Sequence, residues 1–220
     1  MVAPDQERSA VGHGITLHHP LRASKVALNA HFQGYAVNGT PADCIKLGMV
    51  ALLPTRPDMV LAGINPGANV GTNIHYSGTV AAAKEAALLG LPAIAVSVQG
   101  RAVVNFDDAA AFAESLAERV LQQGLPQGTF LNVNIPNVPF RDISGTVISR
   151  QGTGRFDDRF EKRRDPRNRS YYWPGADSQV FDDDPEVDGA ALQGNRISIT
   201  PIKCDMTDYD ALERLRCWCW

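Results

Sequence analysis

The clearest pattern of hydrophobic and polar positions lies between residues 58 and 98. A short apolar run at 58–63 and a second one at 93–98 are typical of buried strands. Between them, residues 77–89 combine small and apolar side chains with good helix formers and no proline, and Gly90 follows as a helix stop. Strand, loop, helix and strand in this order predict a βαβ unit of a parallel sheet.

The segments on either side of this unit also show regular patterns. Short apolar runs favour strands at 15–17 and 35–37, and a helix begins at Thr40 and Pro41, the preferred residues for an N-cap and a first helical position. Pro54 ends this helix. Its expected inward face consists of Cys44, Leu47, Val50 and Ala51.

A second amphipathic helix is predicted at 107–123, and the alternating run at 130–135 predicts a strand that closes the main sheet. The helix is expected to bury Phe112, Leu116, Val120 and Leu121. After residue 137 the pattern changes to short β-like runs, separated by charged segments and followed by a helix at 208–217. These runs are 146–149, 171–173 and 196–200. The change predicts a main unit at 1–137 and a smaller β-rich region at 138–220.

The first charged segment contains a basic cluster that could reach a phosphorylated substrate. Its members are Arg159, Lys162, Arg163, Arg164, Arg167 and Arg169. Acidic residues are interleaved with them, so a solvated, mobile loop is the interpretation that we favour.

Composition narrows the functional classes. The chain has 220 residues, 44% of them hydrophobic, which is ordinary for a soluble domain. A net charge of −3 gives no electrostatic reason to bind a nucleic acid polymer or a membrane. The longest apolar stretch, 86–98, is too short to span a bilayer. The four cysteines lack paired metal-site spacing, which favours a reduced, cytoplasmic setting.

The loop between the strand at 58–63 and the helix at 77–89 carries the strongest functional signal. It contains Gly63, Asn65, Gly67, Asn69, Gly71 and Asn73. Glycines let a backbone approach a ligand, and asparagine amides offer donors and an acceptor without a charge. The helix then begins with Ser77, Gly78 and Thr79, whose free N–H groups favour an anion. Each residue alone can be a turn former or a cap, but together they predict an anion site at the carboxyl ends of the strands.

Six segments in chain order resemble one known family. They are VAPDQERSA at the start, NGTPADCIKLG at 38–48, GINPGANVG at 63–71, YSGTVAAA at 76–83, LNVNIP at 131–136 and SITPI at 198–202. The family is that of the SurE-type survival-protein phosphatases, which are metal-dependent 5′/3′-nucleotidases. The resemblance implies a Rossmann-like three-layer α/β/α domain with a mainly parallel sheet. It also implies a C-terminal region that exchanges elements between subunits of a homodimer or homotetramer.

The resemblance further implies roles for individual residues. Ser9 and Asn65 would be ligands of Mg²⁺ or Mn²⁺. Asn69 and Ser77 would bind and polarise the phosphate of a nucleoside monophosphate, with backbone N–H groups from Gly78 and Thr79.

The chain departs from the family in one respect. The resemblance implies an Asn-Asp-Asp-Gly turn after a first strand, whose aspartates anchor the metal, and the sequence contains no such motif. We therefore expect residues 1–220 alone to be inactive and poorly folded, whether the start is assigned too late or the truncation is real. Two alternatives remain open. They are a non-catalytic nucleotide- or phosphate-binding module and a hydrolase of another bond, such as a nucleosidase.

Overall fold

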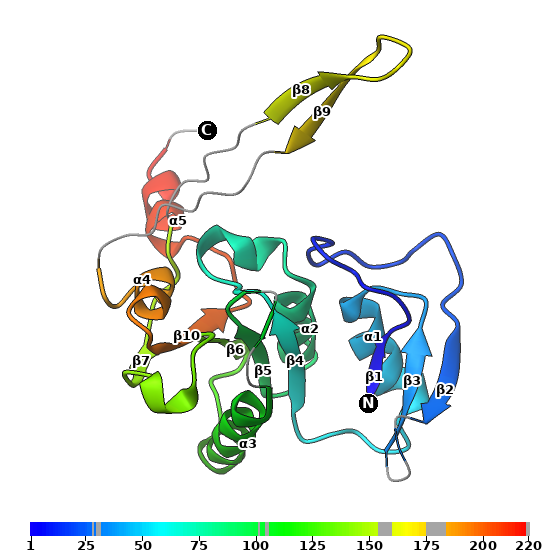
Figure 1. Cartoon of the computed structure of the whole chain (residues 1–220). Helices are drawn as coiled ribbons and strands as arrows, with labels where there is room; N and C mark the ends of the chain where they lie inside the picture. Colours follow the sequence, from blue (N-terminus) through cyan, green and yellow to red (C-terminus); the bar gives the residue numbers. More distant parts are fainter. Residues whose placement is uncertain are drawn as a thin grey trace.

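A five-stranded sheet forms the centre of the structure, in the order β4–β5–β6–β10–β7 (Figure 1). Its strands are β4 (Val60–Pro66), β5 (Ala93–Val98), β6 (Thr129–Ile135), β10 (Ile197–Lys203) and β7 (Thr146–Ile148). β4, β5 and β6 run parallel, β10 is antiparallel to β6, and β7 is parallel to β10. This computed structural model describes residues 1–27, 29, 32–100, 102–103, 106–153, 160–174 and 184–218. The α/β class with a mainly parallel sheet is confirmed.

Helices cover both faces of this sheet. They are α2 (Gly78–Leu88) and α3 (Phe106–Gln123). All residues of β5 are buried. Ile94 and Val96 share a core cluster with residues of α3, whereas Ala93 and Ala95 share a second cluster with residues of α2. A strand that is buried on both faces needs no polar alternation, which explains the continuous apolar run seen in the sequence.

A smaller sheet has the strand order β1–β3–β2. Its strands are β1 (Val2–Pro4), β3 (Gln33–Val37) and β2 (Ala23–Ala27). The helix α1 (Pro41–Leu47) packs against β1 and α2, and it continues into the π-helical turn η1 (Gly48–Leu52). Among the strands of the described ranges, β1 pairs only with β3 and β4 only with β5. Each of them therefore has one unpaired edge, and Leu61 of β4 is 49% exposed.

The C-terminal elements add to the sheet and also project from it. Besides β7 and β10 they are η3 (Phe140–Asp142), β8 (Phe160–Arg164), β9 (Ser170–Pro174), α4 (Asp188–Gln193) and α5 (Tyr209–Arg216). β8 and β9 form a hairpin that stands away from the body (Figure 1). Within the described ranges, no helix is both long and apolar enough to cross a bilayer.

These elements test the sequence expectations for this region. The strands at 146–149, 171–173 and 196–200 and the terminal helix are confirmed within one to three residues at their ends. The loop expected for the basic cluster is wrong where β8 lies, and Arg159 falls outside the described residues. The boundary near residue 137 stays a prediction.

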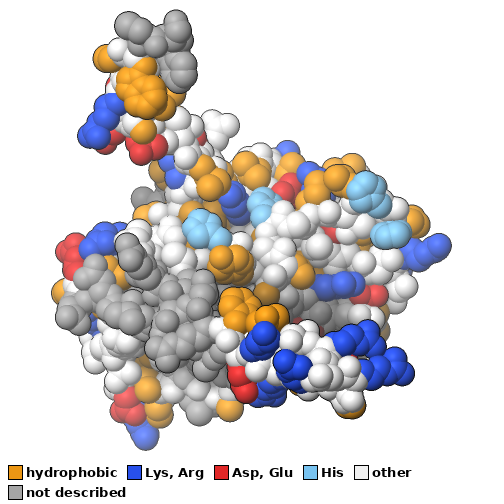
Figure 2. Space-filling model, turned by 90° about the horizontal axis from the view of Figure 1, so that it is seen from above, with side chains coloured by type: hydrophobic (Ala, Val, Ile, Leu, Met, Phe, Trp, Pro, Cys, Tyr) orange, Lys and Arg blue, Asp and Glu red, His pale blue; other side chains and the backbone are white. Residues whose placement is uncertain are grey.

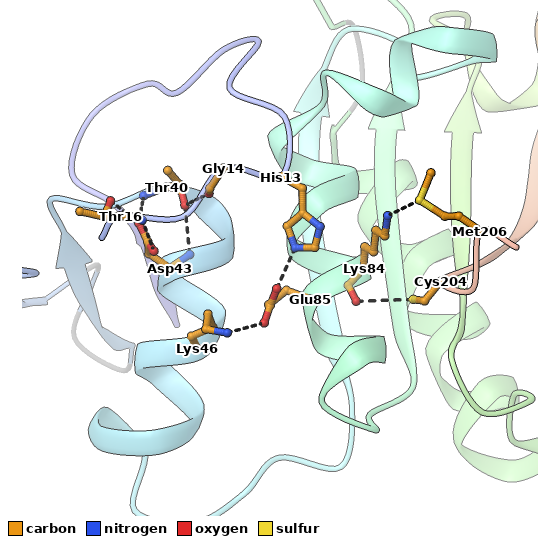
Figure 3. A network of polar contacts seen from close by, with 10 residues as sticks. All are labelled: His13, Gly14, Thr16, Thr40, Asp43, Lys46, Lys84, Glu85, Cys204 and Met206. Atoms are coloured by element: carbon orange, nitrogen blue, oxygen red, sulfur yellow. Dashed lines mark hydrogen bonds and ion pairs between the residues drawn. The ribbon is translucent and has the colours of Figure 1, made fainter. Parts of the chain in front are cut away.

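Three packing expectations were wrong. No strand forms at 15–17, because Asp43 holds this segment as a loop by accepting hydrogen bonds from Thr16 N (2.9 Å) and Thr16 Oγ1 (2.6 Å) (Figure 3). In the first helix, the π-helical turn shifts the register, so Val50 is 83% exposed and Ala51 is exposed as well. Leu121 is 53% exposed, while its neighbour Val120 is buried.

The position of β6 is also different from the expectation. It lies in the middle of the sheet rather than closing it, because β10 pairs with its second edge.

We predict that Asp43 stabilises the fold by joining the 15–17 loop to the start of α1. Burial raises the pKa of this carboxyl, but hydrogen bonds from Thr16 and Thr40 outweigh burial and hold the pKa below its ordinary value of 3.8. Asp43→Ala should lower the free energy of unfolding at pH 7 by about 1–3 kcal/mol. The difference from wild type should be largest above pH 3.8 and should decrease as the pH falls through the lower folded-state pKa, because the protonated carboxyl keeps only its weaker hydrogen bonds.

Urea unfolding across this pH range measures the effect of Asp43. Asp58 is exposed, so Asp58→Ala is the matched control and should leave the free energy of unfolding nearly unchanged. Equal destabilisation by the two variants would contradict the role of Asp43.

Candidate active site

All six site residues expected from the sequence line one pocket, at the carboxyl ends of β1 and β4 and the start of α2. The pocket has a volume of about 1130 Å³, and its walls are the segments 4–10, 65–69 and 76–79 together with Pro41 and Asn73. Two segments that are distant in the sequence, the loop after β1 and the connection between β4 and α2, thus meet at one edge of the two sheets. The members expected from the sequence are Ser9, Asn65, Asn69, Ser77, Gly78 and Thr79. Their individual roles stay predictions.

The start of α2 forms one wall of the pocket. Ser77 is the N-cap, and its Oγ accepts a hydrogen bond from Val80 N at 3.2 Å. The N–H groups of Gly78 and Thr79 lie in the first turn, where no intrahelical acceptor exists. A Cβ added to Gly78 would lie 2.9 Å from Pro41 Cγ, so close packing against α1 also requires a glycine here.

Asn69 is held by polar side chains of the central strands. Its backbone N–H donates to Asn134 Oδ1 (2.7 Å), and its carbonyl oxygen accepts from Asn132 Nδ2 (2.8 Å) and Asn134 Nδ2 (3.1 Å). Its own Nδ2 donates to Ser97 Oγ at 2.7 Å. Asn69 is 8% exposed, so these contacts fix the loop where it enters the pocket.

Asn132 and Asn134 are functional residues that sequence reasoning missed. They occupy alternate positions of the buried strand β6, on the same face as Phe130, and both are completely buried. Two amides at positions i and i+2 of an apolar strand are the signal that could have revealed them, because buried amides need hydrogen-bond partners.

The geometry of β4 presents Asn65 to the pocket. The pairing of β4 with β5 shifts register between Ala62 and Asn65. Gly63 has a φ of +142°, and a Cβ there would lie only 2.5 Å from Val96 O, so no other residue fits. Asn65 Nδ2 donates to Gly67 O at 2.8 Å, which orients the amide and leaves its oxygen available to a cation.

A cluster of polar contacts holds the loop that carries Ser9. His13 Nε2 lies 2.7 Å from Glu85 Oε2 on α2, and Lys46 Nζ on α1 lies 3.1 Å from Oε1 of the same carboxylate (Figure 3). The Glu85 side chain is only 8% exposed, so this carboxylate is well shielded from solvent. The cluster joins α1, α2 and the loop at the rim of the pocket.

Arg8 is a pocket residue that was not expected. Its Nε is buried and has no hydrogen-bond partner within the described part of the chain, and its Nη2 lies 3.8 Å from Asp5 Oδ1. A guanidinium with an unused N–H at a pocket that also contains a helix start can bind an anion. The sequence feature that could have revealed Arg8 is its position in the loop directly after a strand.

The pocket offers oxygen donors to a cation, but few of them. Ser9 Oγ donates to Glu7 Oε1 at 2.6 Å, and the carboxylates of Asp5 and Glu7 line the pocket together with Ser9 and Asn65. Hydroxyl, amide and carboxylate oxygens are the donor types that Mg²⁺ and Mn²⁺ prefer. Within the described residues, no three His, Cys, Asp or Glu side chains lie together in a way that could hold a metal ion. The oxygen donors of the pocket are therefore of the type that such a cation binds, but they are few.

We predict that the loop at Asn69 depends on β6. Asn134→Ala removes the acceptor of Asn69 N–H and a donor to Asn69 O, and it should cost about 1–3 kcal/mol of unfolding free energy. Amide hydrogen exchange at 67–71 should become faster. Asn137→Ala, which alters an amide that bonds Ala102 O instead, is the control and should leave exchange at 67–71 unchanged. Unchanged protection in Asn134→Ala would show that Asn134 does not hold the loop.

The chain is similar to several known proteins. A family model described as "Survival protein SurE" matches residues 1–158. A relative from Desulfatibacillum aliphaticivorans named 5'-nucleotidase SurE is 54% identical over 218 residues, covering 99% of this chain and 86% of that protein. One of the same name from Geobacter sulfurreducens is 48% identical, covering 99% and 82%. The crystal structure of a SurE protein from Aquifex aeolicus superimposes with a TM-score of 0.83 at 38% identity, covering 98% of this chain and 86% of that one.

Proposed function

Because the chain belongs to the SurE survival-protein family, we propose that its pocket hydrolyses nucleoside 5′- or 3′-monophosphates to a nucleoside and phosphate. The observation that carries the proposal is the convergence of a helix start, a neutral asparagine loop and Arg8 on one pocket. The pocket volume of about 1130 Å³ is sufficient for a mononucleotide. The names of the relatives support the reaction type.

The phosphate would lie against the start of α2. Backbone N–H groups of Gly78 and Thr79 and the positive end of the helix would bind its oxygens, and the Ser77 hydroxyl would add a contact. Asn69 Nδ2 uses one hydrogen for Ser97, so its second hydrogen is available to the phosphoryl group. Since buried partners already orient this amide, little reorganisation is needed as charge redistributes in the transition state.

Ser9 and Asn65 would hold a divalent cation, Mg²⁺ or Mn²⁺, with help from the carboxylates of the 5–9 loop. When bound, such a cation polarises phosphoryl oxygens and lowers the pKa of a bound water. The proposal is supported by the shared pocket wall and by the oxygen donor types.

Assembly and location complete the proposal. We propose a homodimer or homotetramer in which elements of 138–220 pass between subunits, in a cytoplasmic setting. The hairpin β8–β9 supports the assembly, because Phe160, Tyr172 and Trp173 are 66%, 58% and 55% exposed. Exposed hydrophobic and basic side chains also lie side by side on the face seen in Figure 2. Free thiols at Cys44, Cys204 and Cys217 support the reducing setting.

A non-catalytic nucleotide-binding module is the second candidate. The absence of a three-ligand acidic or histidine cluster within the described residues favours it. Incubation of a protein extended at its N-terminus by the Asn-Asp-Asp-Gly turn with Mn²⁺ and AMP, followed by assay of free phosphate, separates the two candidates when calorimetry measures AMP binding in parallel. Binding without phosphate release supports the module. The same assay on residues 1–220 tests the expectation that this chain alone is inactive.

In a protein extended at its N-terminus by the Asn-Asp-Asp-Gly turn that the resemblance implies, we predict that Asn69→Ala lowers kcat about 100-fold with a smaller change in KM. The reason is that the amide meets charge that develops in the transition state. Ser97→Ala keeps the amide but removes its orienting partner, and should give a smaller decrease in kcat. Steady-state phosphate release measures both variants. An unchanged kcat in Asn69→Ala would remove Asn69 from the catalytic residues.

We predict that Ser9→Ala and Asn65→Ala weaken Mn²⁺ binding. Electron paramagnetic resonance of free Mn²⁺ during a titration measures the affinity without any turnover. Thr16→Ala, which changes a hydroxyl of the same loop that bonds Asp43, is the control for loss of a hydroxyl and should keep the wild-type midpoint. A wild-type midpoint in Ser9→Ala or Asn65→Ala excludes that residue as a ligand.

A further inference from the structure

Asp188 is a buried carboxylate outside the pocket with an unusual set of partners. Its side chain is completely buried at the first position of α4. Oδ2 accepts a hydrogen bond from Gly71 N (2.8 Å), and Oδ1 accepts from Gly152 N (3.0 Å) and Gly189 N (2.7 Å). Burial raises the pKa of Asp188, and the three N–H donors oppose this shift. A buried charge is costly unless such donors compensate it.

The contact with Gly71 has a second arm. Gln151 Nε2 donates to Gly71 O at 3.1 Å, so segments near 151 and 188 bind both backbone polar groups of Gly71. A Cβ added at Gly152 would lie 3.1 Å from Asp188 Oδ1 and 3.6 Å from Gly71 Cα. Three segments that are far apart in sequence therefore meet at this junction with no spare volume.

Gly71 lies between two parts of the proposed phosphate site. It begins the 3₁₀ turn η2 (Gly71–His75), which joins Asn69 to Ser77. Its φ of +58° is in the left-handed region, and a glycine adopts it without strain. The strands β5 and β6 fix Asn69 on one side, so Gly71 is the next point at which the bridge to α2 is anchored.

A role limited to capping α4 does not explain this geometry. The bond from Gly189 N to Oδ1 is enough for a local cap, and α4 has only six residues. The second oxygen points to a partner 117 residues earlier in the chain. Only a carboxylate can accept from all three donors at once, since the amide nitrogen of an asparagine has no lone pair to offer.

We infer that Asp188 is a positioning residue that clamps the 69–77 bridge, and thereby sets the geometry of the Asn69 amide and the start of α2 around the phosphate. This inference rests on the proposed function. Because the clamp belongs to the segment that follows β9, packing of the C-terminal region controls the pocket through Gly71.

The decisive variant is Asp188→Asn. Its remaining carbonyl oxygen can keep Gly152 N–H and Gly189 N–H, but its amide group faces the Gly71 N–H as a second donor. Hydrogen exchange at 70–77 should become faster. In the protein extended at its N-terminus by the Asn-Asp-Asp-Gly turn, kcat for AMP with Mn²⁺ should fall about 10- to 100-fold, the size expected for misplaced catalytic groups. Gln151→Ala removes the second arm without touching the buried charge and should act in the same direction with a smaller size.

Val120→Ala is the matched control. Val120 of α3 is buried in the core cluster on the face of the sheet opposite α2, so its substitution lowers stability without changing the clamp or β6. At equal loss of thermal stability, it should leave exchange at 70–77 and kcat near wild type.

Two outcomes would overturn the inference. One is equal exchange and equal kcat in Asp188→Asn and Val120→Ala, and the other is wild-type exchange at 70–77 in both Asp188→Asn and Gln151→Ala. If the N-terminally extended wild-type protein neither binds nor hydrolyses AMP, the proposed function is wrong instead. The exchange comparison needs no ligand, so it still decides whether Asp188 holds the bridge.

Discussion

The structure depends on one requirement, namely that the backbone of the loop between β4 and α2 finds hydrogen-bond partners where it crosses the buried edge of the sheet. Unpaired N–H and C=O groups in such a place are costly. No regular ladder is available to a loop, so side chains take its place. Asn132 and Asn134 serve Asn69, and Asp188 and Gln151 serve Gly71. The pocket is shaped by this requirement.

The hydrogen bonds to the loop backbone link two different parts of the chain. β5 and β6 belong to the parallel core, whereas Gln151 and Asp188 lie beyond it in the sequence. The core strands are rigid because helices bury both of their faces, so their amides are fixed donors and acceptors. The C-terminal residues Gln151 and Asp188 bind the same loop at Gly71, two positions after Asn69. The loop is therefore held between a stiff core and a region that, in our proposal, also takes part in assembly.

Sequence reasoning succeeded where local pattern and tertiary packing agree. The strand at 93–98, the cap at Ser77 and the stop at Gly90 are encoded within a few residues, and the structure has all of them. The prediction failed at 15–17, where a short apolar run favoured a strand but Thr16 donates two hydrogen bonds to Asp43 instead. The predicted burial of Val50 was wrong because a π-helical turn, which no periodicity in the sequence reveals, rotates the helix face.

The residues that line the pocket were predicted better than the residues that hold them in place. Ser77 and Asn69 belong to short motifs that can be read locally, and they do line the pocket. The partners of Asn69 and Gly71 lie 63 and 117 residues away, and nothing in the loop sequence indicates which distant amide or carboxylate serves it. Long-range polar pairing is specified only by the completed fold, because it needs both a free acceptor and a fixed position in space.

There is a chemical reason why some residues line the pocket while other, buried residues hold them in place. A phosphate can be bound by charges, but charges at an open pocket are screened by water and ions, whereas dipoles that are already oriented need no rearrangement when charge develops. The loop at 65–73 has no charged side chain, and a single arginine contributes a cation to the pocket wall. Neutral donors are effective only when they are rigid. The performance of such a pocket is therefore set largely by buried residues that never touch the ligand, and these residues are found by following the backbone hydrogen bonds outward from the loop.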